Sequence, residues 1–161
     1  MIDQTNKIPF SKGVWRTMKI STKGRYALRL MLDIAINGAA APVPLKDAAE
    51  RQAISVKYLE QIISSLVRAG FVKSIRGPQG GYRLAKTPAD YTVGMILRQV
   101  EGSMVPVACL EEGSMDCKRQ GECVTLRIWK ELDQAIRGVL DKYTLEDLTG
   151  WQEASGDNYV I

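Results

Sequence analysis

The sequence predicts a mainly α-helical fold that carries one small β-hairpin, and three features of its 161 residues support this. Apolar residues recur at helical spacing in several segments, which is typical of amphipathic helices. Two short strand-like segments flank a Gly-rich turn, RGPQGG. A long amphipathic segment follows towards the C-terminus. Two helices joined by a tight turn and followed by a hairpin form a winged helix-turn-helix, so we predict this fold with a long helix after it.

The second helix of this unit and its hairpin lie within residues 54–82. Ser55 is predicted to cap the helix, and Gly70 to end it. One face carries the apolar stripe and is predicted to be buried: Leu59, Ile62, Ile63, Leu66 and Val67. The other face is predicted to be exposed: Lys57, Tyr58, Gln61 and Ser64. Residues 76–81 then form the tip of the hairpin, and a surface hairpin without a function is the alternative reading.

The element just upstream favours the functional reading. Residues 44–52 form a short helix, and only two residues separate it from Ser55. A first helix is predicted within residues 18–37, and Asn37 and Gly38 end it. Lys23 and Arg25 lie near its start, where they can hold a phosphate or simply be solvated.

Charge is distributed unevenly along the chain. Residues 1–37 carry seven Lys and Arg against two acids, residues 38–86 carry eight against three, and residues 87–161 carry seven against thirteen. The basic part contains the helix-turn-helix, so a polyanion such as double-stranded DNA is the expected partner, although an incidentally basic surface would look the same. No signal peptide or membrane-spanning segment is expected, which indicates a cytoplasmic protein with reduced cysteines.

All three cysteines lie in one short segment after a capped helix that ends near Gly102. They are Cys109, Cys117 and Cys123, and this grouping indicates a joint role. Three thiolates can ligate an iron–sulfur cluster or zinc, or form a redox-labile pair with one thiol left over. The spacing does not decide among these. Because the chain has no histidine, a fourth ligand must be a carboxylate, a backbone group, solvent or a residue of another chain.

A long helix is predicted over residues 124–143. Its apolar stripe lies far along the chain from the core and therefore needs a partner. This partner is either the chain's own winged domain or, as we expect, a second copy of the chain. The residues expected at this dimer interface are Ile128, Leu132, Ile136 and Val139. Thr144 begins a capping-box pattern for one last short turn.

Five segments result from this reading. They are a flexible arm (1–17), the winged helix-turn-helix (18–102), the cysteine segment (103–123), the dimerisation helix with its cap (124–148) and a tail (149–161). We expect no catalytic site, because the chain lacks histidine, a nucleophile motif and a phosphate-binding loop.

The sequence resembles the Rrf2 family of transcriptional regulators. The resemblance lies in MKISTKGRYALRLMLDIA, in ISVKYLEQIISSLVRAGFVKSIRGPQGGYRL, in the cysteine segment before a long helix and in TLEDL, and it extends from Met18 to about Leu148. The family includes iron–sulfur cluster regulators, nitric-oxide-sensing repressors and cysteine-metabolism repressors. The resemblance implies a homodimer that binds palindromic promoter DNA.

The resemblance also implies roles for individual residues. Ser55, Lys57, Tyr58 and Gln61 occupy positions of the recognition-helix surface, and Glu60 either reaches a cytosine amino group or is merely solvated. Arg76 occupies the wing tip, where an arginine gains from the potential of a narrow minor groove. Gly77, Gly80 and Gly81 would let the wing backbone approach the DNA closely.

For the cysteines the resemblance favours an iron–sulfur cluster, 2Fe–2S or alternatively 4Fe–4S, over zinc. The sequence departs from the family pattern in two ways. The first cysteine spacing is longer, and Leu126 stands where the cluster regulator has a histidine ligand. Arg25 stands where nitric-oxide sensors take an acid. The fourth ligand is therefore unknown, and a regulator that senses thiol oxidation or an effector without a cluster is the alternative.

Overall fold

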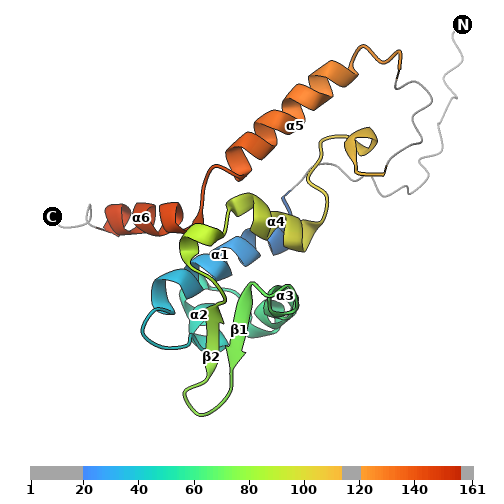
Figure 1. Ribbon diagram of the computed structural model, residues 1–161. Helices are drawn as coiled ribbons and strands as arrows, with labels where there is room; N and C mark the ends of the chain where they lie inside the picture. Colours follow the sequence, from blue (N-terminus) through green and yellow to red (C-terminus); the bar gives the residue numbers. More distant parts are fainter. Residues whose placement is uncertain (1–19, 114–120, 157–161) are drawn as a thin grey trace, which may run out of the picture.

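The computed structural model describes residues 20–113 and 121–156. The predicted arm (1–17) and Cys117 lie outside the described residues. Within them the chain forms six α-helices, two short 3-10 helices and one two-stranded antiparallel hairpin (Figure 1). None of the described helices is long and apolar enough to cross a membrane.

Helix α1 (Thr22–Asn37) is the central element, and α2, α3, α4 and α6 all pack against it. Its apolar residues recur every three or four positions, so one face becomes fully buried. Ser21 caps the helix by accepting a hydrogen bond from the backbone N–H of Gly24 at 3.2 Å.

Helices α2 (Leu45–Gln52) and α3 (Val56–Arg68) form the predicted helix-turn-helix. Pro44 was predicted to lie in the first turn of α2. It is the N-cap of the helix instead, one position before that turn. The turn passes through Ala53, whose φ of 52° lies in the left-handed region. Ser55 then caps α3, as predicted, by accepting a hydrogen bond from the backbone N–H of Tyr58.

The hairpin follows α3 directly. Strands β1 (Val72–Ile75) and β2 (Gly81–Leu84) pair in antiparallel register, with Val72 opposite Leu84 and Ile75 opposite Gly81. The start of β2, next to the hairpin tip, is joined to the loop before α2, because Val43 and Tyr82 exchange backbone hydrogen bonds of 2.9 and 2.8 Å. Strand β2 is therefore fixed to the helix-turn-helix, and the turn between the two strands projects away from the helices (Figure 1).

The chain then returns to α1. The 3-10 helix η1 (Pro88–Asp90) leads into α4 (Val93–Glu101), which Thr92 caps as predicted. A loop with a second 3-10 helix, η2 (Ala108–Leu110), carries Cys109. Helices α5 (Leu126–Leu140) and α6 (Leu145–Gly156) complete the described chain.

Helix α6 is longer than the single short turn predicted after Thr144. Residues 149–156, expected as part of a loose tail, continue the helix. Leu145 is fully buried, and the Trp151 ring lies edge-on against Tyr143 with centroids 5.0 Å apart. The burial of Leu145 in the core and the local ring contact with Tyr143 stabilise a helix whose own apolar pattern is weak.

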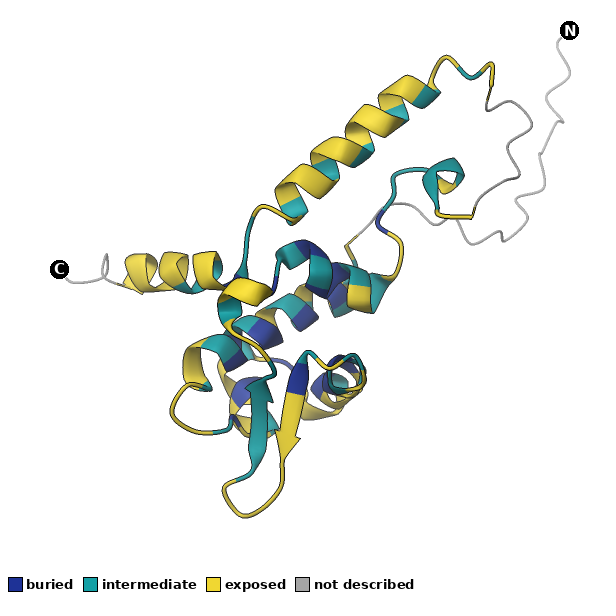
Figure 2. Cartoon of the chain, viewed as in Figure 1, coloured by how far each residue is buried: buried dark blue, intermediate teal, exposed yellow. Residues whose placement is uncertain are grey.

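The core lies between α1, α3 and α4 (Figure 2). Fully buried side chains from these three helices meet there, with further apolar residues from β1 and α6: Leu30, Met31, Leu59, Ile62, Leu66, Val72, Ile96 and Leu145. The structure thus confirms the predicted mainly helical winged helix-turn-helix with a hairpin, and places one long helix, α5, outside its core.

Candidate DNA-binding surface and cysteine segment

The exposed face of α3 carries the polar side chains predicted for contact with DNA. Ser55, Lys57, Glu60 and Gln61 are all exposed. Tyr58 was predicted to be exposed but is half-buried, because its ring lies edge-on against Tyr26 of α1 with centroids 5.7 Å apart. The buried stripe on the opposite side fixes α3 against the core, so these polar groups are held on a rigid support.

A buried ion pair holds the helix-turn-helix to α1, and the sequence reading missed it. Asp33 is only 2% exposed, and it accepts two hydrogen bonds from the Arg51 guanidinium at 2.9 and 2.7 Å and one from Gln52 at 3.1 Å. Arg29 completes the group by donating to the Gln52 side chain at 3.0 Å. The hydrogen bonds to Asp33 raise the pKa of Arg51. The sequence did contain a signal for this ion pair. Asp33 lies next to Ile34 of the apolar stripe, and a carboxylate buried there needs a partner.

The hairpin tip exposes one arginine on a glycine-rich turn. Arg76 and Gly77 are exposed, and Gly80 donates a backbone hydrogen bond to Gly77 at 2.9 Å. Gly77 has a φ of 121°, which side-chain-bearing residues rarely adopt. A Cβ on Gly81 would lie 2.5 Å from the Val43 backbone, so glycine is required where the hairpin joins the helix-turn-helix.

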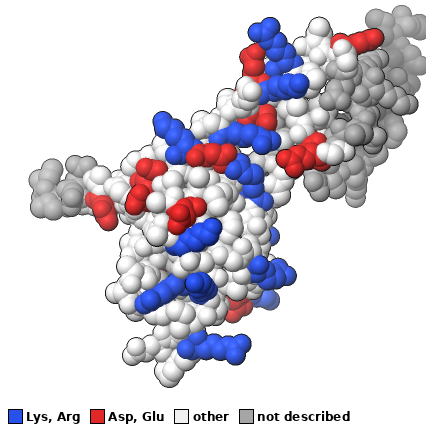
Figure 3. All heavy atoms as spheres, in the orientation of Figure 1, with Lys and Arg blue, Asp and Glu red and all other residues white. Residues whose placement is uncertain are grey.

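Positive charge gathers around this end of the molecule. On the face drawn in Figure 3, Lys and Arg lie over both parts of the molecule, whereas most of the Asp and Glu lie over the upper part with α4, α5 and α6, so the lower part is the more basic one. At the start of α1, Arg25 is exposed and Lys23 is half-buried. Arg25 donates to the Thr22 hydroxyl at 3.2 Å, which leaves most of its guanidinium available to a phosphate.

The start of α1 is also linked to the end of α4. The Ser21 backbone N–H and hydroxyl both donate to a carboxylate oxygen of Glu101, at 2.9 and 2.6 Å. A Cβ on Gly24 would collide with that carboxylate. Glu101 is the last residue of α4 and leads into the cysteine segment, so this segment is mechanically connected to the start of α1. The sequence reading did not find this contact either.

The structure describes two of the three cysteines. Cys109 in η2 and Cys123 before α5 are both half-buried. The Cys123 sulfur lies 3.3 Å from the Thr125 hydroxyl. Among the residues placed by the structure, no three His, Cys, Asp or Glu side chains converge as a metal site, and Cys117 is not among those residues. The two described thiols are the soft donors that iron–sulfur clusters use, so their chemistry fits, and the three-cysteine site stays a prediction.

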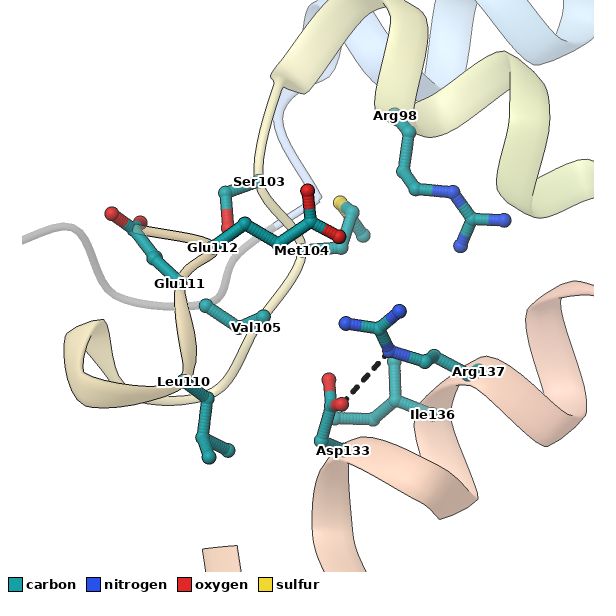
Figure 4. Close-up of a pocket in the computed structure, with 10 residues that line it drawn as sticks. All are labelled: Arg98, Ser103, Met104, Val105, Leu110, Glu111, Glu112, Asp133, Ile136 and Arg137. Atoms are coloured by element: carbon teal, nitrogen blue, oxygen red, sulfur yellow. Dashed lines mark hydrogen bonds and ion pairs between the residues drawn. The ribbon is translucent and has the colours of Figure 1, made fainter. Parts of the chain in front are cut away.

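A cavity of about 350 Å³ separates the cysteine segment from α5. Arg137 of α5 donates to Asp133 at 2.8 Å within its wall, and Arg98 of α4 is directed towards the same space (Figure 4). Arg98 also pairs with Asp141 just beyond α5, which ties α4 to the end of that helix. Met104, Leu110 and Ile136 are among the apolar residues that line the cavity.

Helix α5 therefore presents two different faces. Ile136 is half-buried and faces the cavity, together with Asp133. Three of the residues predicted at the dimer interface are exposed instead: Ile128 (59%), Leu132 (42%) and Val139 (59%). No residue of α5 is buried. The exposed apolar face has spacing suited to a partner helix, and the half-buried Ile136 borders it.

Comparison with known proteins decides the family. Residues 20–150 match the model of the Rrf2 family, described as iron-dependent transcriptional regulators. The chain belongs to the Rrf2 family. The resemblance found in the sequence is thereby confirmed, as is the expectation that the protein is a transcriptional regulator and not an enzyme.

Relatives within the Rrf2 family include two kinds of named regulator. The transcriptional regulator IscR of Photobacterium profundum is 44% identical over 142 residues, which cover 86% of this chain and 81% of that protein. The structure of CymR, the global cysteine regulator of B. subtilis, has a TM-score of 0.71 and 42% identity, covering 83% of this chain and 97% of that one. The structure of T. potens IscR has a TM-score of 0.68 and 40% identity, covering 89% and 92%.

Proposed function

We propose that this Rrf2 regulator binds palindromic promoter DNA as a homodimer and senses iron–sulfur or redox status through its three cysteines. The observation that supports DNA binding is the exposed polar face of α3. The core fixes this helix in place, and the cationic wing tip lies beside it. A recognition helix needs this rigid presentation, because its side chains must meet base edges in a fixed register. The family and its named regulators support the proposal.

Within this proposal the residues of α3 divide by chemistry. Ser55, Lys57 and Tyr58 hold phosphates, which position the helix in the major groove. Glu60 and Gln61 read base edges, a carboxylate accepting from cytosine and an amide bonding to adenine. Arg25 and Lys23 at the start of α1 add further phosphate contacts.

The wing contacts the minor groove. Arg76 enters it, where the guanidinium is attracted by the negative potential between the two backbones. Gly77 and Gly80 carry no side chain that would keep the wing backbone from the phosphates. The anchoring of β2 to the loop before α2 sets the distance between this arginine and α3.

The homodimer forms through the exposed face of α5. Ile128, Leu132 and Val139 pack against the same residues of a second copy, since a two-fold axis makes the surface self-complementary. Ile136 closes the cavity wall behind this interface. Two α3 helices then face two half-sites of a palindrome.

Cys109, Cys117 and Cys123 are the proposed ligands of an iron–sulfur cluster, 2Fe–2S or 4Fe–4S, with an unknown fourth ligand. Such a cluster supplies a redox-active and labile group whose gain or loss changes the charge and order of its segment. The chain's own residues relay that change: Glu101 holds the start of α1, and Arg98 with Asp141 holds the end of α5. Two states of the segment thereby favour different poses of the reading helices. We place the protein in the cytoplasm.

A salt titration tests DNA binding. Affinity for promoter duplexes should fall steeply as salt rises, because each neutralised phosphate releases a counterion. Arg76→Ala should weaken binding by about 5- to 100-fold. The matched control is Arg127→Ala, which removes an 88% exposed arginine from α5 and should change affinity less than about twofold. Affinity that is flat with salt and indifferent to Arg76→Ala would refute the proposal.

Anaerobic purification tests the cluster. Visible charge-transfer absorption with matching iron and sulfide, lost in Cys109→Ala, Cys117→Ala and Cys123→Ala, is the expected result. A colourless, iron-free protein would favour the second candidate, a regulator that senses thiol oxidation or an effector. Similarity to a cysteine regulator at a TM-score of 0.71 is the observation that keeps this candidate.

A further inference from the structure

Val56 is an apolar side chain in an unexpected position. It is the first residue of α3 and is 37% exposed, between the exposed Ser55 and Lys57. Helix α3 is described throughout, and its other exposed residues are polar or charged: Lys57, Glu60, Gln61, Ser64 and Arg68. Val56 is therefore the one exposed hydrophobic residue of this helix.

Its place on the helix aligns it with the polar reading face. Residues four apart lie above one another on an α-helix, so Val56, Glu60 and Ser64 form one row. Leu59 and Ile63 of the buried stripe lie three and seven positions after Val56, so Val56 stands at the boundary between the stripe and the polar face. The first turn of a recognition helix enters the major groove furthest, so Val56 belongs to the part of α3 that comes closest to base edges.

Packing at the edge of the buried stripe accounts for the covered part of Val56 and leaves the exposed part unexplained. A single exposed hydrophobic residue is common on protein surfaces. Val56 also borders a shallow hollow with Ala53 and Ile54. However, a β-branched residue gives no advantage to a helix start, and over a third of the side chain remains in water. A ligand that covers Val56 would remove its exposed apolar surface from water, which lowers the free energy.

We propose that Val56 is a specificity-determining residue that recognises thymine by contact with its 5-methyl group. In the major groove this methyl is the apolar group that distinguishes thymine from the other bases, and small apolar side chains are its partners. This inference rests on the proposed DNA binding and adds the base that the start of α3 selects. Glu60, one turn further along, reads a neighbouring base pair.

The test begins without a known operator. Wild-type protein selects binding sites from a random duplex library, and a palindromic duplex is made from the enriched sequence. Each thymine is then replaced by deoxyuridine, which lacks only the methyl, in both half-sites together. Affinities are measured by fluorescence anisotropy for the wild type, for Val56→Ala and for the control Val124→Ala, which shortens a valine that is 90% exposed outside α3.

At one thymine of each half-site, deoxyuridine should weaken wild-type binding about fourfold per methyl, or about fifteenfold for the pair. Val56→Ala should reduce this sensitivity to less than about twofold, while Val124→Ala should keep it. Because the change is made in the DNA, a loss of protein stability cannot imitate this pattern. Equal sensitivity of the wild type and Val56→Ala, or a wild type insensitive to every replacement, would overturn the inference. Failure of the wild type to enrich any sequence would overturn the proposed DNA binding itself.

Discussion

The winged domain and helix α5 differ in how their residues are supported. The winged domain buries a continuous core drawn from α1, α3 and α4. Helix α5 has no buried residue, and three large apolar side chains on one face are exposed. The first region is stable through its own packing, whereas the second gains stability from what it contacts. The difference separates the rigid part of the molecule from the part to which we assign the proposed dimer interface.

Ion pairs show the same contrast. Asp33 is almost fully buried and accepts two hydrogen bonds from Arg51 in a bidentate arrangement. On α5, Arg127 and Glu131 are 88% and 66% exposed, so water screens their attraction. Electrostatics therefore fixes geometry in the winged domain and contributes little to α5.

The largest expected effect is a core truncation in the winged domain. Leu59→Ala removes a fully buried side chain from α3, and the cavity it leaves should lower the free energy of unfolding by about 2–5 kcal/mol. Leu132→Ala, at a 42% exposed position of α5, should cost the isolated monomer less than about 1 kcal/mol. Urea denaturation at low protein concentration measures both. Equal losses would show that α5 belongs to the same cooperative core.

The next effect concerns the two aspartate–arginine pairs. Asp33→Asn keeps the shape of the side chain but removes its charge, and should cost about 1–3 kcal/mol because hydrogen bonds to a charged group are lost. Asp133→Asn on α5 removes the partner of the 52% exposed Arg137 and should cost less than about 0.5 kcal/mol. Thermal unfolding compares them. A larger loss for Asp133→Asn would reverse the assignment of rigid and dependent regions.

A charge on the exposed face of α5 should break the proposed dimer. Leu132→Asp should weaken self-association about tenfold or more, because it places a carboxylate in an apolar interface. Lys130→Asp, at an exposed polar position of the same helix, is the control that should leave the dimer intact. Sedimentation velocity over a concentration series measures both. A dimer that survives Leu132→Asp would exclude this face as the interface.

The smallest effect is a pH dependence of two exposed caps. The Thr144 backbone N–H and hydroxyl donate to Asp147 and hold its pKa below the usual value; the Thr87 hydroxyl and backbone N–H do the same for Asp90. A lowered pKa means that each cap stabilises the fold above the unfolded-state pKa and loses this as pH falls through the folded-state pKa. NMR titration from about pH 6 to about pH 2 should show both low pKa values. Asp147→Asn should remove the acid-dependent fraying of α6, and fraying that persists unchanged would assign it to another group.

Much of the fold was predictable because local signals and burial agree. Ser55 begins α3 where the cap was expected, and Gly70 follows its end. Contacts between distant segments could not be read in the same way. The position of α6 depends on Leu145, which is fully buried in the core formed by the preceding helices. The hydrogen bonds between Ser21 and Glu101 join residues eighty positions apart, and no local sequence pattern predicts them.

The candidate site shows the same limit. The exposed face of α3 was predictable, since a helical stripe fixes its own opposite side. Asp33 was not recognised as a buried hub because its partner Arg51 lies on another helix. Periodicity places Ile136 near the stripe of α5, but only the path of the cysteine segment shows that it lines a cavity.

The one-sided attachment of α5 makes this helix a lever arm. Its C-terminal end is fixed: Val93 donates to Tyr143 and Leu145 donates to Tyr91, both at 2.9 Å, and Arg98 pairs with Asp141. At its other end Val124 is 90% exposed. Fifteen residues span about 22 Å, so a tilt of about 10° at the fixed end moves the far end by about 4 Å. That displacement is close to the rise of one DNA base pair, ~3.4 Å.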